Sequence, residues 1–234
     1  MIKVILFDLD GTLLPMNQDE FVKAYFGLLA KKLAPIGYEP KQLINSIWAG
    51  TKAMVLNNGE KTNEEVFWDK FAEIYGEKVR KDITYFYEYY KFDFDKVQSV
   101  CGYNPKAKYV IDKLKKLGYR LALATNPIFP AIATEKRIKW AGLDKNDFEL
   151  YTTYENSKYS KPNPNYYASI LETLGVKPKE CLMVGNDATE DMIANSIGIN
   201  VYLFTDCLIN KEGKDISAFP QGDFDQLLNY ITKI

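Results

Sequence analysis

The sequence contains no histidine. Histidine is the general base of Ser-His-Asp and Cys-His mechanisms and a usual ligand of zinc, so its absence excludes these mechanisms and the common zinc sites. Acid–base chemistry in this protein must therefore depend on carboxylates, lysine or tyrosine.

Cysteine is scarce as well. The three cysteines, Cys101, Cys181 and Cys207, are far apart and form no CxxC pattern. This spacing argues against both a disulfide framework and a cysteine-based metal site. We expect these residues to be buried thiols.

An excess of charge and long apolar runs are also missing. Thirty lysines and arginines against 31 acids give a net charge of −1, so no electrostatic attraction to nucleic acid or an anionic membrane is expected. The apolar run at residues 4–7 is short and ends at Asp8, which excludes a signal peptide or a spanning helix there. We expect a cytoplasmic protein, a monomer or weak homodimer, with no nucleic-acid or membrane partner.

The sequence does contain an apolar run followed directly by Asp8-Leu9-Asp10-Gly11-Thr12. In an extended chain Asp8 and Asp10 point the same way, so their charges meet at the end of one strand and require a shared proton or a divalent cation. Gly11 permits a sharp turn, and Thr12 offers a hydroxyl and an exposed N–H to an anion. The alternative is an ordinary Asp-rich turn after a strand.

Residues 15–95 show helical patterns only. A first helix is expected to open at Asp19 or Glu20, and a later one at Thr62, where Thr62 and Glu65 match a capping box. The dense aromatic content of this stretch favours packing between helices, although it also hints at a substrate with apolar or ring character.

From about residue 104 helical patterns alternate with short apolar strands, which predicts an α/β fold with a parallel sheet flanked by helices. The predicted domains are an α/β core of residues 1–14 and 96–234 and an inserted all-helical cap of residues 15–95. The insert leaves and re-enters near the first strand, so it can form a lid. The expected strands after the first are residues 121–124, 148–152, 181–184 and 200–204.

Distinctive polar residues follow three of these apolar strands: Asp8 and Asp10, then Thr125, then Asp187. Ligands of open α/β sheets bind at the C-terminal ends of the strands, so these side chains are expected to meet in one crevice.

The acids in this crevice suit phosphoryl transfer. Asp8 is placed to attack phosphorus and form an aspartyl-phosphate, and Asp10 to act as acid and base. Asp187 can complete an oxygen-only coordination sphere with Asp8, a backbone carbonyl and waters, which suits Mg²⁺. Asp191, one helical turn further on, is better suited to hold a metal-bound water; Asp187 and Asp191 could instead cap a helix. The candidate metal ligands are Asp8, Asp10, Asp187 and Asp191.

Three further segments are candidates for binding the phosphoryl group and substrate. Thr125 and the Asn126 N–H lie where phosphate oxygens can bind, and Lys161 would spread positive charge over the phosphoryl group. Each could also be a simple turn, and Lys52, placed to meet a second negative charge, could simply be solvated. The substrate-binding candidates are Gly11, Thr12, Thr125, Asn126, Lys161 and Lys52, and the catalytic candidates are Asp8, Asp10, Thr125 and Lys161.

The order of these motifs resembles the haloacid dehalogenase superfamily, specifically its phosphatase-like members with a helical cap. The resemblance implies a Rossmann-like core, Mg²⁺, an aspartyl-phosphate at Asp8 and a small phosphorylated metabolite as substrate. Asp10 argues against a dehalogenase, because those relatives generally lack an acid there, and Asn186 replaces an acid that some relatives have. The four matching segments are Asp8 to Thr12, Thr125-Asn126, Lys161-Pro162, and Gly185-Asn186-Asp187 through Asp191.

The sequence thus predicts a magnesium-dependent phosphatase. A sugar-phosphate mutase of the same superfamily would use the same core while excluding water. A non-catalytic phospho-acceptor or regulatory protein is the other alternative, against which the complete set of acids and Lys161 argues.

Overall fold

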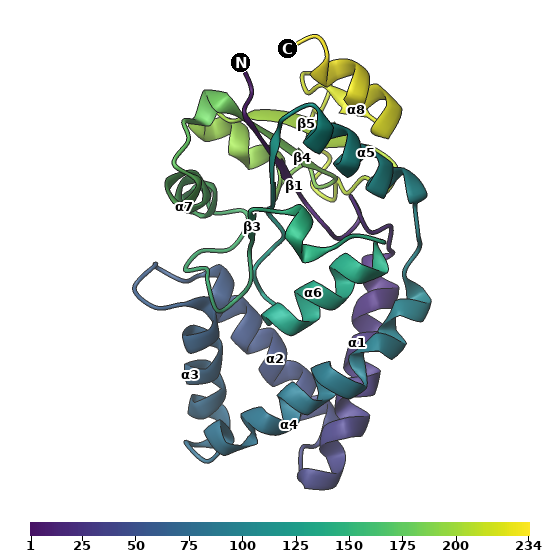
Figure 1. The fold of residues 1–234 in the computed structure, drawn as a ribbon. Coiled ribbons are helices and arrows are strands. Elements are labelled where there is room, and N and C mark those ends of the chain that lie inside the picture. Colours follow the sequence, from purple (N-terminus) through teal and green to yellow (C-terminus); the bar gives the residue numbers. More distant parts are fainter.

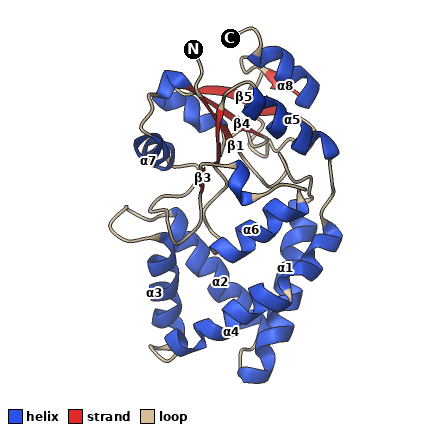
Figure 2. Cartoon of the chain, in the orientation of Figure 1, coloured by secondary structure: helices blue, strands red, loops and turns tan.

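The computed structural model describes all residues 1–234 and contains one six-stranded parallel sheet with the order β3-β2-β1-β4-β5-β6 (Figures 1 and 2). Phe7 of β1 lies opposite Leu123 on one side and Val184 on the other, so three strands end at the same level. The predicted parallel sheet is therefore confirmed. The strands are β1 (Val4–Phe7), β2 (Arg120–Leu123), β3 (Leu150–Tyr151), β4 (Cys181–Gly185), β5 (Asn200–Phe204) and β6 (Gln221–Gly222).

Helices cover both faces of the sheet, which explains why β1 is apolar at every position. Ile5 and Phe7 face a hydrophobic cluster that includes residues of three helices, α5 (Pro105–Lys116), α6 (Ala131–Trp140) and α8 (Phe224–Ile231). Val4 and Leu6 face a second cluster, built with α7 (Pro164–Leu174) and the 3₁₀ helix η5 (Met192–Ile197). Figure 1 accordingly shows α7 on one side of the sheet and α5 and α8 on the other.

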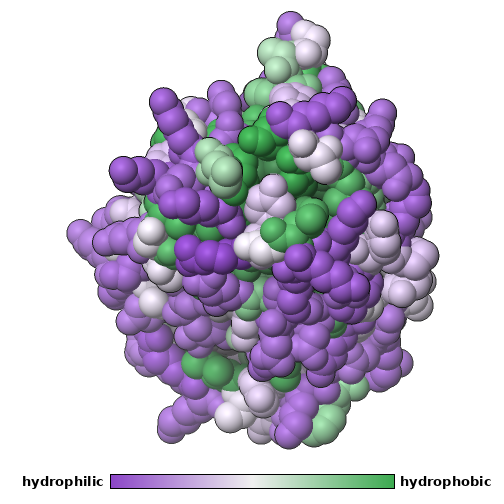
Figure 3. All heavy atoms as spheres, turned by 45° about the horizontal axis from the view of Figure 1, so that its top comes forward, coloured by the Kyte–Doolittle hydropathy of each residue, from purple (hydrophilic) through white to green (hydrophobic).

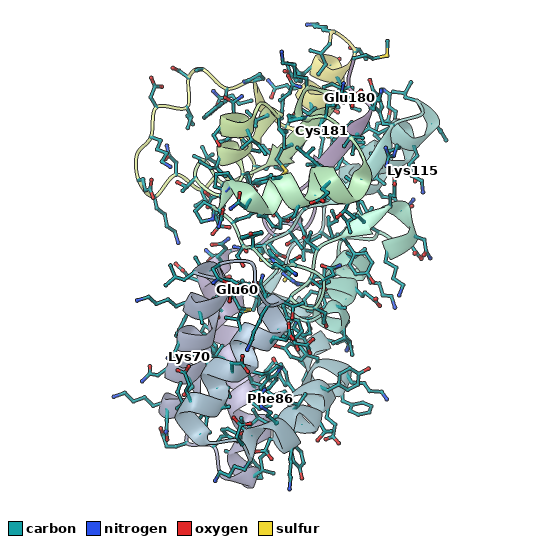
Figure 4. The ribbon with its side chains drawn as sticks, turned by 90° about the vertical axis from the view of Figure 1, so that its left-hand side faces the viewer. Glu60, Lys70, Phe86, Lys115, Glu180 and Cys181 are labelled. Carbon is teal, nitrogen blue, oxygen red and sulfur yellow. The ribbon has the colours of Figure 1, made fainter.

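Residues 15–95, here called the helical segment, lie between β1 and α5 and contain four α-helices and no strand. In Figure 4 the labelled Phe86 lies among these helices in the lower half of the molecule, whereas Cys181 lies in the upper half with the sheet. The large hydrophobic cluster on the Ile5 face of the sheet continues into this segment. The helices are α1 (Gln18–Leu33), α2 (Pro40–Val55), α3 (Asn63–Tyr75) and α4 (Val79–Phe92), followed by the 3₁₀ helix η2 (Phe94–Val100).

The predicted capping box of α3 is confirmed, because the Glu65 N–H donates to Thr62 Oγ1 at 3.2 Å and the Thr62 N–H donates to Glu65 Oε2 at 2.8 Å. The predicted start of α1 at Asp19 or Glu20 was wrong. Asn17 Oδ1 accepts hydrogen bonds from the N–H groups of both residues, so Asn17 is the cap.

Two predictions of the sheet and its connections also differ from the structure. The strand expected at residues 148–152 is reduced to the two-residue β3, and the equally short edge strand β6 was not predicted because its two residues, Gln221 and Gly222, carry no apolar pattern. Asp191 was expected one helical turn after Asp187, but the 3₁₀ helix starts only at Met192, because Asp187 Oδ1 accepts from the N–H groups of Thr189 and Glu190 and forms a turn.

The surface is mixed in character. The face turned forward in Figure 3 is mostly hydrophilic, with hydrophobic side chains gathered in a band across its upper part. No helix of the structure combines the length and the apolar character needed to span a membrane.

One buried side chain, Asn63 at the start of α3, links the helical segment to the loops beside the sheet. It donates from Nδ2 to the Pro127 carbonyl and to Ser160 Oγ, both at 3.0 Å. Its Oδ1 accepts from Asn57 Nδ2 at 2.9 Å. Asn63 is fully buried, so water could not take over its hydrogen bonds to these partners if the side chain were removed.

We expect Asn63→Ala to lower the free energy of unfolding by about 2 kcal/mol, because buried partners are left unpaired. Urea unfolding followed by circular dichroism measures this. Asn229→Ala is the control, since Asn229 is exposed on α8 and its side chain makes no hydrogen bond. Equal small effects of both substitutions would contradict the structural role of Asn63.

Candidate active site

A cavity of about 840 Å³ lies between the helical segment and the C-terminal ends of the central strands. Its wall contains most of the polar residues that the sequence singles out: Asp8, Asp10, Thr125, Asn126, Asp187 and Asp191. The volume is within the usual range for sites that bind small molecules. The expected convergence of these residues at one edge of the sheet is therefore observed.

Asp8 follows β1 directly and is held in place by the sheet. Its N–H donates to the Val184 carbonyl at 2.9 Å, which extends the strand pairing by one residue. The carboxylate is 6% exposed and accepts hydrogen bonds from Lys161 Nζ at 2.8 Å and from Thr12 Oγ1 at 3.2 Å. Both donors stabilise the charged carboxylate that a nucleophile requires.

Asp10 forms an ion pair with Arg137, a fully buried residue of α6 whose guanidinium lies 4.6 Å from the centre of the Phe129 ring. Burial raises the pKa of Asp10 and outweighs the lowering by Arg137, and Asp8 raises this pKa further. The second oxygen of Asp10, Oδ1, is buried without a hydrogen-bond partner. A carboxyl group with a raised pKa and an unpaired oxygen at the cavity wall suits an acid and base.

The sequence reasoning missed Arg137. A signal for it was present, because Arg137 occurs at helical spacing with the apolar residues Ala133 and Ala141, on the buried face of α6. A charged residue on such a face needs a buried partner of opposite charge.

Lys161 is 1% exposed and lies between two carboxylates, with Nζ 2.8 Å from Asp8 Oδ1 and 2.6 Å from Asp191 Oδ1. Burial lowers the pKa of Lys161, but Asp191 and Asp8 outweigh it, so the pKa is raised and the amine stays charged. The lysine is not part of the cavity wall. It therefore stabilises the carboxylates directly.

Asp187 and Asp191 follow β4 and are joined to each other. The Asp187 N–H donates to Asp191 Oδ2 at 2.9 Å, and burial raises the pKa of Asp191. Gly185 allows this arrangement, because a Cβ atom there would lie 2.2 Å from the Asp191 carboxyl group. Asp187 Oδ1 accepts from the N–H groups of Thr189 and Glu190 in the turn before η5, and Asp191 makes no capping hydrogen bond, so neither residue caps a helix as the alternative supposed.

The four predicted metal ligands do not form one cluster. No group of three or more acidic, cysteine or histidine side chains lies close enough to hold a metal ion. Arg137 occupies one oxygen of Asp10, and Lys161 and a backbone N–H occupy both oxygens of Asp191. All four line the cavity, and Asp8 and Asp187, which follow the neighbouring strands β1 and β4, are two carboxylates that together with waters form a donor set that fits Mg²⁺.

Thr12 and Gly11 do not offer their groups to a ligand, which corrects the prediction for both. The Thr12 N–H donates to the Leu9 carbonyl at 3.2 Å, and its hydroxyl donates to Asp8 and Asn186. Gly11, with a φ of 91°, makes the expected turn, but its N–H closes that turn internally and neither residue is part of the cavity wall.

The available donors at the cavity wall are instead the backbone N–H of Asp10, which the sequence reasoning did not single out, and the predicted N–H of Asn126. Neither makes a hydrogen bond within the protein. Thr125, buried before Asn126, is fixed because its carbonyl accepts from Thr152 Oγ1 at 2.6 Å and from the Tyr166 hydroxyl at 2.8 Å. Unpaired N–H groups at the ends of adjacent strands can bind phosphate oxygens.

Two further side chains, Glu190 and Lys52, differ in their position relative to the cavity. Glu190, which was not predicted, lines the cavity and accepts from Asn126 Nδ2 at 3.0 Å, and burial raises its pKa to about 7. Lys52 is exposed and is not part of the wall, which corrects its assignment as a substrate ligand. The helical period of α2 turns Thr51 and Val55 towards the cavity and Lys52 away from it.

Comparison with known proteins agrees with this site. A family model described as haloacid dehalogenase-like hydrolase matches residues 2–196. A pyrophosphatase of Bacillus cereus is 27% identical over 186 residues, which cover 80% of this chain and 75% of the relative. A phosphoglycolate phosphatase of Aquifex aeolicus is 29% identical over 187 residues, which cover 79% of this chain and 76% of the relative.

Among solved structures, a phosphatase of the same superfamily from Thermococcus onnurineus has the same fold, with a TM-score of 0.59, 18% identity and 98% of each chain covered. The family match extends from β1 to the turn after β4 and so includes every polar residue of the site. The chain therefore belongs to the haloacid dehalogenase-like hydrolases and is a phosphatase-like member of that family.

Proposed function

We propose that this protein is a magnesium-dependent phosphatase that hydrolyses a small phosphorylated metabolite through an aspartyl-phosphate on Asp8. The observation that carries the proposal is the buried Asp8 carboxylate, held by Lys161 and Thr12 at the wall of a cavity that also contains Asp10. We also propose that the helical segment is the cap over this cavity. Its helices supply much of the wall opposite the strand ends.

In the first step an oxygen of Asp8 attacks phosphorus, the bond from phosphorus to the ester oxygen breaks, and Asp10 gives its proton to the leaving alcohol. In the second step Asp10 takes a proton from a water that attacks the aspartyl-phosphate, which releases phosphate and restores Asp8. The free N–H groups of Asp10 and Asn126, both residues of the cavity wall, would bind phosphoryl oxygens during both steps.

The remaining acids and Lys161 hold this arrangement. Asp8 and Asp187 are the residues that would hold Mg²⁺, and the bound ion supplies positive charge to the phosphoryl oxygens. Lys161 pairs with Asp8 and orients it, and Asp191 in turn holds Lys161. Arg137, which does not line the cavity, fixes Asp10 through their ion pair.

The substitution Asp8→Asn should lower the rate of phosphate release by at least about 10³-fold, because an amide is a poor nucleophile. Phosphate release from a panel of phosphorylated metabolites with Mg²⁺ measures this. Asp215→Asn, which changes an exposed loop carboxylate outside the cavity, is the matched control. Retained turnover in Asp8→Asn would refute the nucleophile, and product formation without free phosphate would favour a mutase.

Removal of divalent metal by a chelator should stop phosphate release, and added Mg²⁺ should restore it, because the cavity wall presents no cation of its own to the phosphoryl group. The same titration should be repeated with Asp187→Asn, which removes one proposed ligand charge. This variant should need a higher Mg²⁺ concentration for half-maximal activity. Undiminished turnover in excess chelator would reject the metal requirement.

A further inference from the structure

The part of the cavity away from Asp8 is built from aromatic side chains of all four helices of the helical segment. The aromatic residues of this wall include Tyr25, Phe26, Trp48, Phe67, Phe86 and Tyr90. Of the 33 residues that line the whole cavity, 19 are hydrophobic. A wall of this kind binds flat or apolar groups by contact rather than by charge.

Close packing fixes part of this aromatic wall. A Cβ atom at Gly50 would lie 2.6 Å from the Phe67 ring, so α2 and α3 approach closely because residue 50 is a glycine. The rings of Phe26 and Trp48 are 5.4 Å apart, and those of Phe67 and Trp68 are 5.1 Å apart. The wall is therefore a set of mutually packed rings with defined positions.

The charges of the cavity wall have one sign only. No lysine or arginine is among the residues that line it, whereas Glu64, Glu135, Glu155 and Glu190 are present in addition to the aspartates. Lys145 pairs with Glu135 at 2.9 Å, and both oxygens of Glu155 accept from the Ala131 N–H, at 2.9 and 3.0 Å. Glu64 has no cationic partner. Burial raises its pKa and the carboxylates of Glu155 and Glu65 raise it further, and these effects outweigh the lowering by the Tyr154 hydroxyl.

A second negative charge on the substrate would therefore be unfavourable in this cavity. A phosphate or carboxylate on the leaving group, as in pyrophosphate or phosphoglycolate, would lose its water without gaining a basic partner. It would also meet the carboxylates of Glu64 and Glu155 in a partly dry space, where like charges repel strongly. An uncharged ring or apolar chain meets neither penalty.

We propose that the natural substrate is a phosphomonoester whose leaving alcohol carries a ring or an apolar chain and no negative charge. The proposal rests on the proposed phosphatase function, because it assigns the aromatic end of the cavity to the leaving group. Glu64 is then a residue that determines specificity, since it rejects anionic leaving groups.

The test compares two esters of the same shape, 4-carbamoylphenyl phosphate and 4-carboxyphenyl phosphate, which differ by one negative charge. With Mg²⁺ present, kcat/KM for the carbamoyl ester should exceed that for the carboxy ester by at least about tenfold, because like charges are costly in a desolvated site. Benzyl phosphate should likewise be a better substrate than methyl phosphate, because only its ring contacts the aromatic wall.

Variants separate cavity charge from the chemistry of the two leaving groups. In Glu64→Gln the ratio of the two kcat/KM values should fall about fivefold or more, because the substitution keeps the shape and removes the charge. Glu60→Gln is the matched control, since Glu60 lies on the exposed loop before α3 and does not line the cavity (Figure 4). The ratio of the two kcat/KM values in Glu60→Gln should equal that of the wild-type protein.

The outcomes distinguish the two proposals. No phosphate release from any of these esters, from pyrophosphate or from phosphoglycolate would overturn the phosphatase function itself. Release with equal or reversed preference for the carboxy ester, or from the two anionic substrates alone, would overturn only the inference about the leaving group. So would a ratio that is unchanged in Glu64→Gln, or methyl phosphate as good a substrate as benzyl phosphate.

Discussion

The site depends on one buried cation, Lys161, placed between the carboxylates of Asp8 and Asp191. Loss of one partner of such a group is costly, typically about 3–5 kcal/mol, because uncompensated charge stays buried. The three residues come from the end of β1, the loop before α7 and the turn after β4. A single charge therefore connects three segments that are distant in the sequence, and it fixes the Asp8 carboxylate at the cavity wall.

Much of this arrangement follows from local sequence. Apolar runs predict the strands, and parallel strands bring their C-terminal ends to one edge, so Asp8, Thr125 and Asp187 could be placed together without a structure. The capping box of Thr62 and Glu65 involves residues three apart and needs no tertiary information. These predictions succeeded because each depends on contacts within one element or on the direction of the sheet.

The predictions that failed depend on contacts that local patterns do not encode. Arg137 meets Asp10 across 127 positions of the chain, and nothing near Asp10 indicates that partner. The N–H of Thr12 donates to the carbonyl of Leu9, and this hydrogen bond depends on the path of the backbone through the turn. Lys52 points away from the cavity because the packing of α2 sets how this helix is rotated about its axis. A single lysine in a helical pattern does not indicate that rotation.

The two buried cations also explain the character of the cavity. Arg137 and Lys161 pair with carboxylates of the cavity wall but do not themselves line the cavity, so neither contributes positive charge to the wall. A phosphoryl dianion that approaches Asp8 consequently needs a cation from outside the chain, which is the role proposed for Mg²⁺ between Asp8 and Asp187. Such an ion serves only the end of the cavity near the sheet. At the aromatic end the chain supplies no cation, so a charged leaving group would have no partner of opposite charge there. The same distribution of charge therefore accounts for both the metal requirement and the selectivity that we propose for this site.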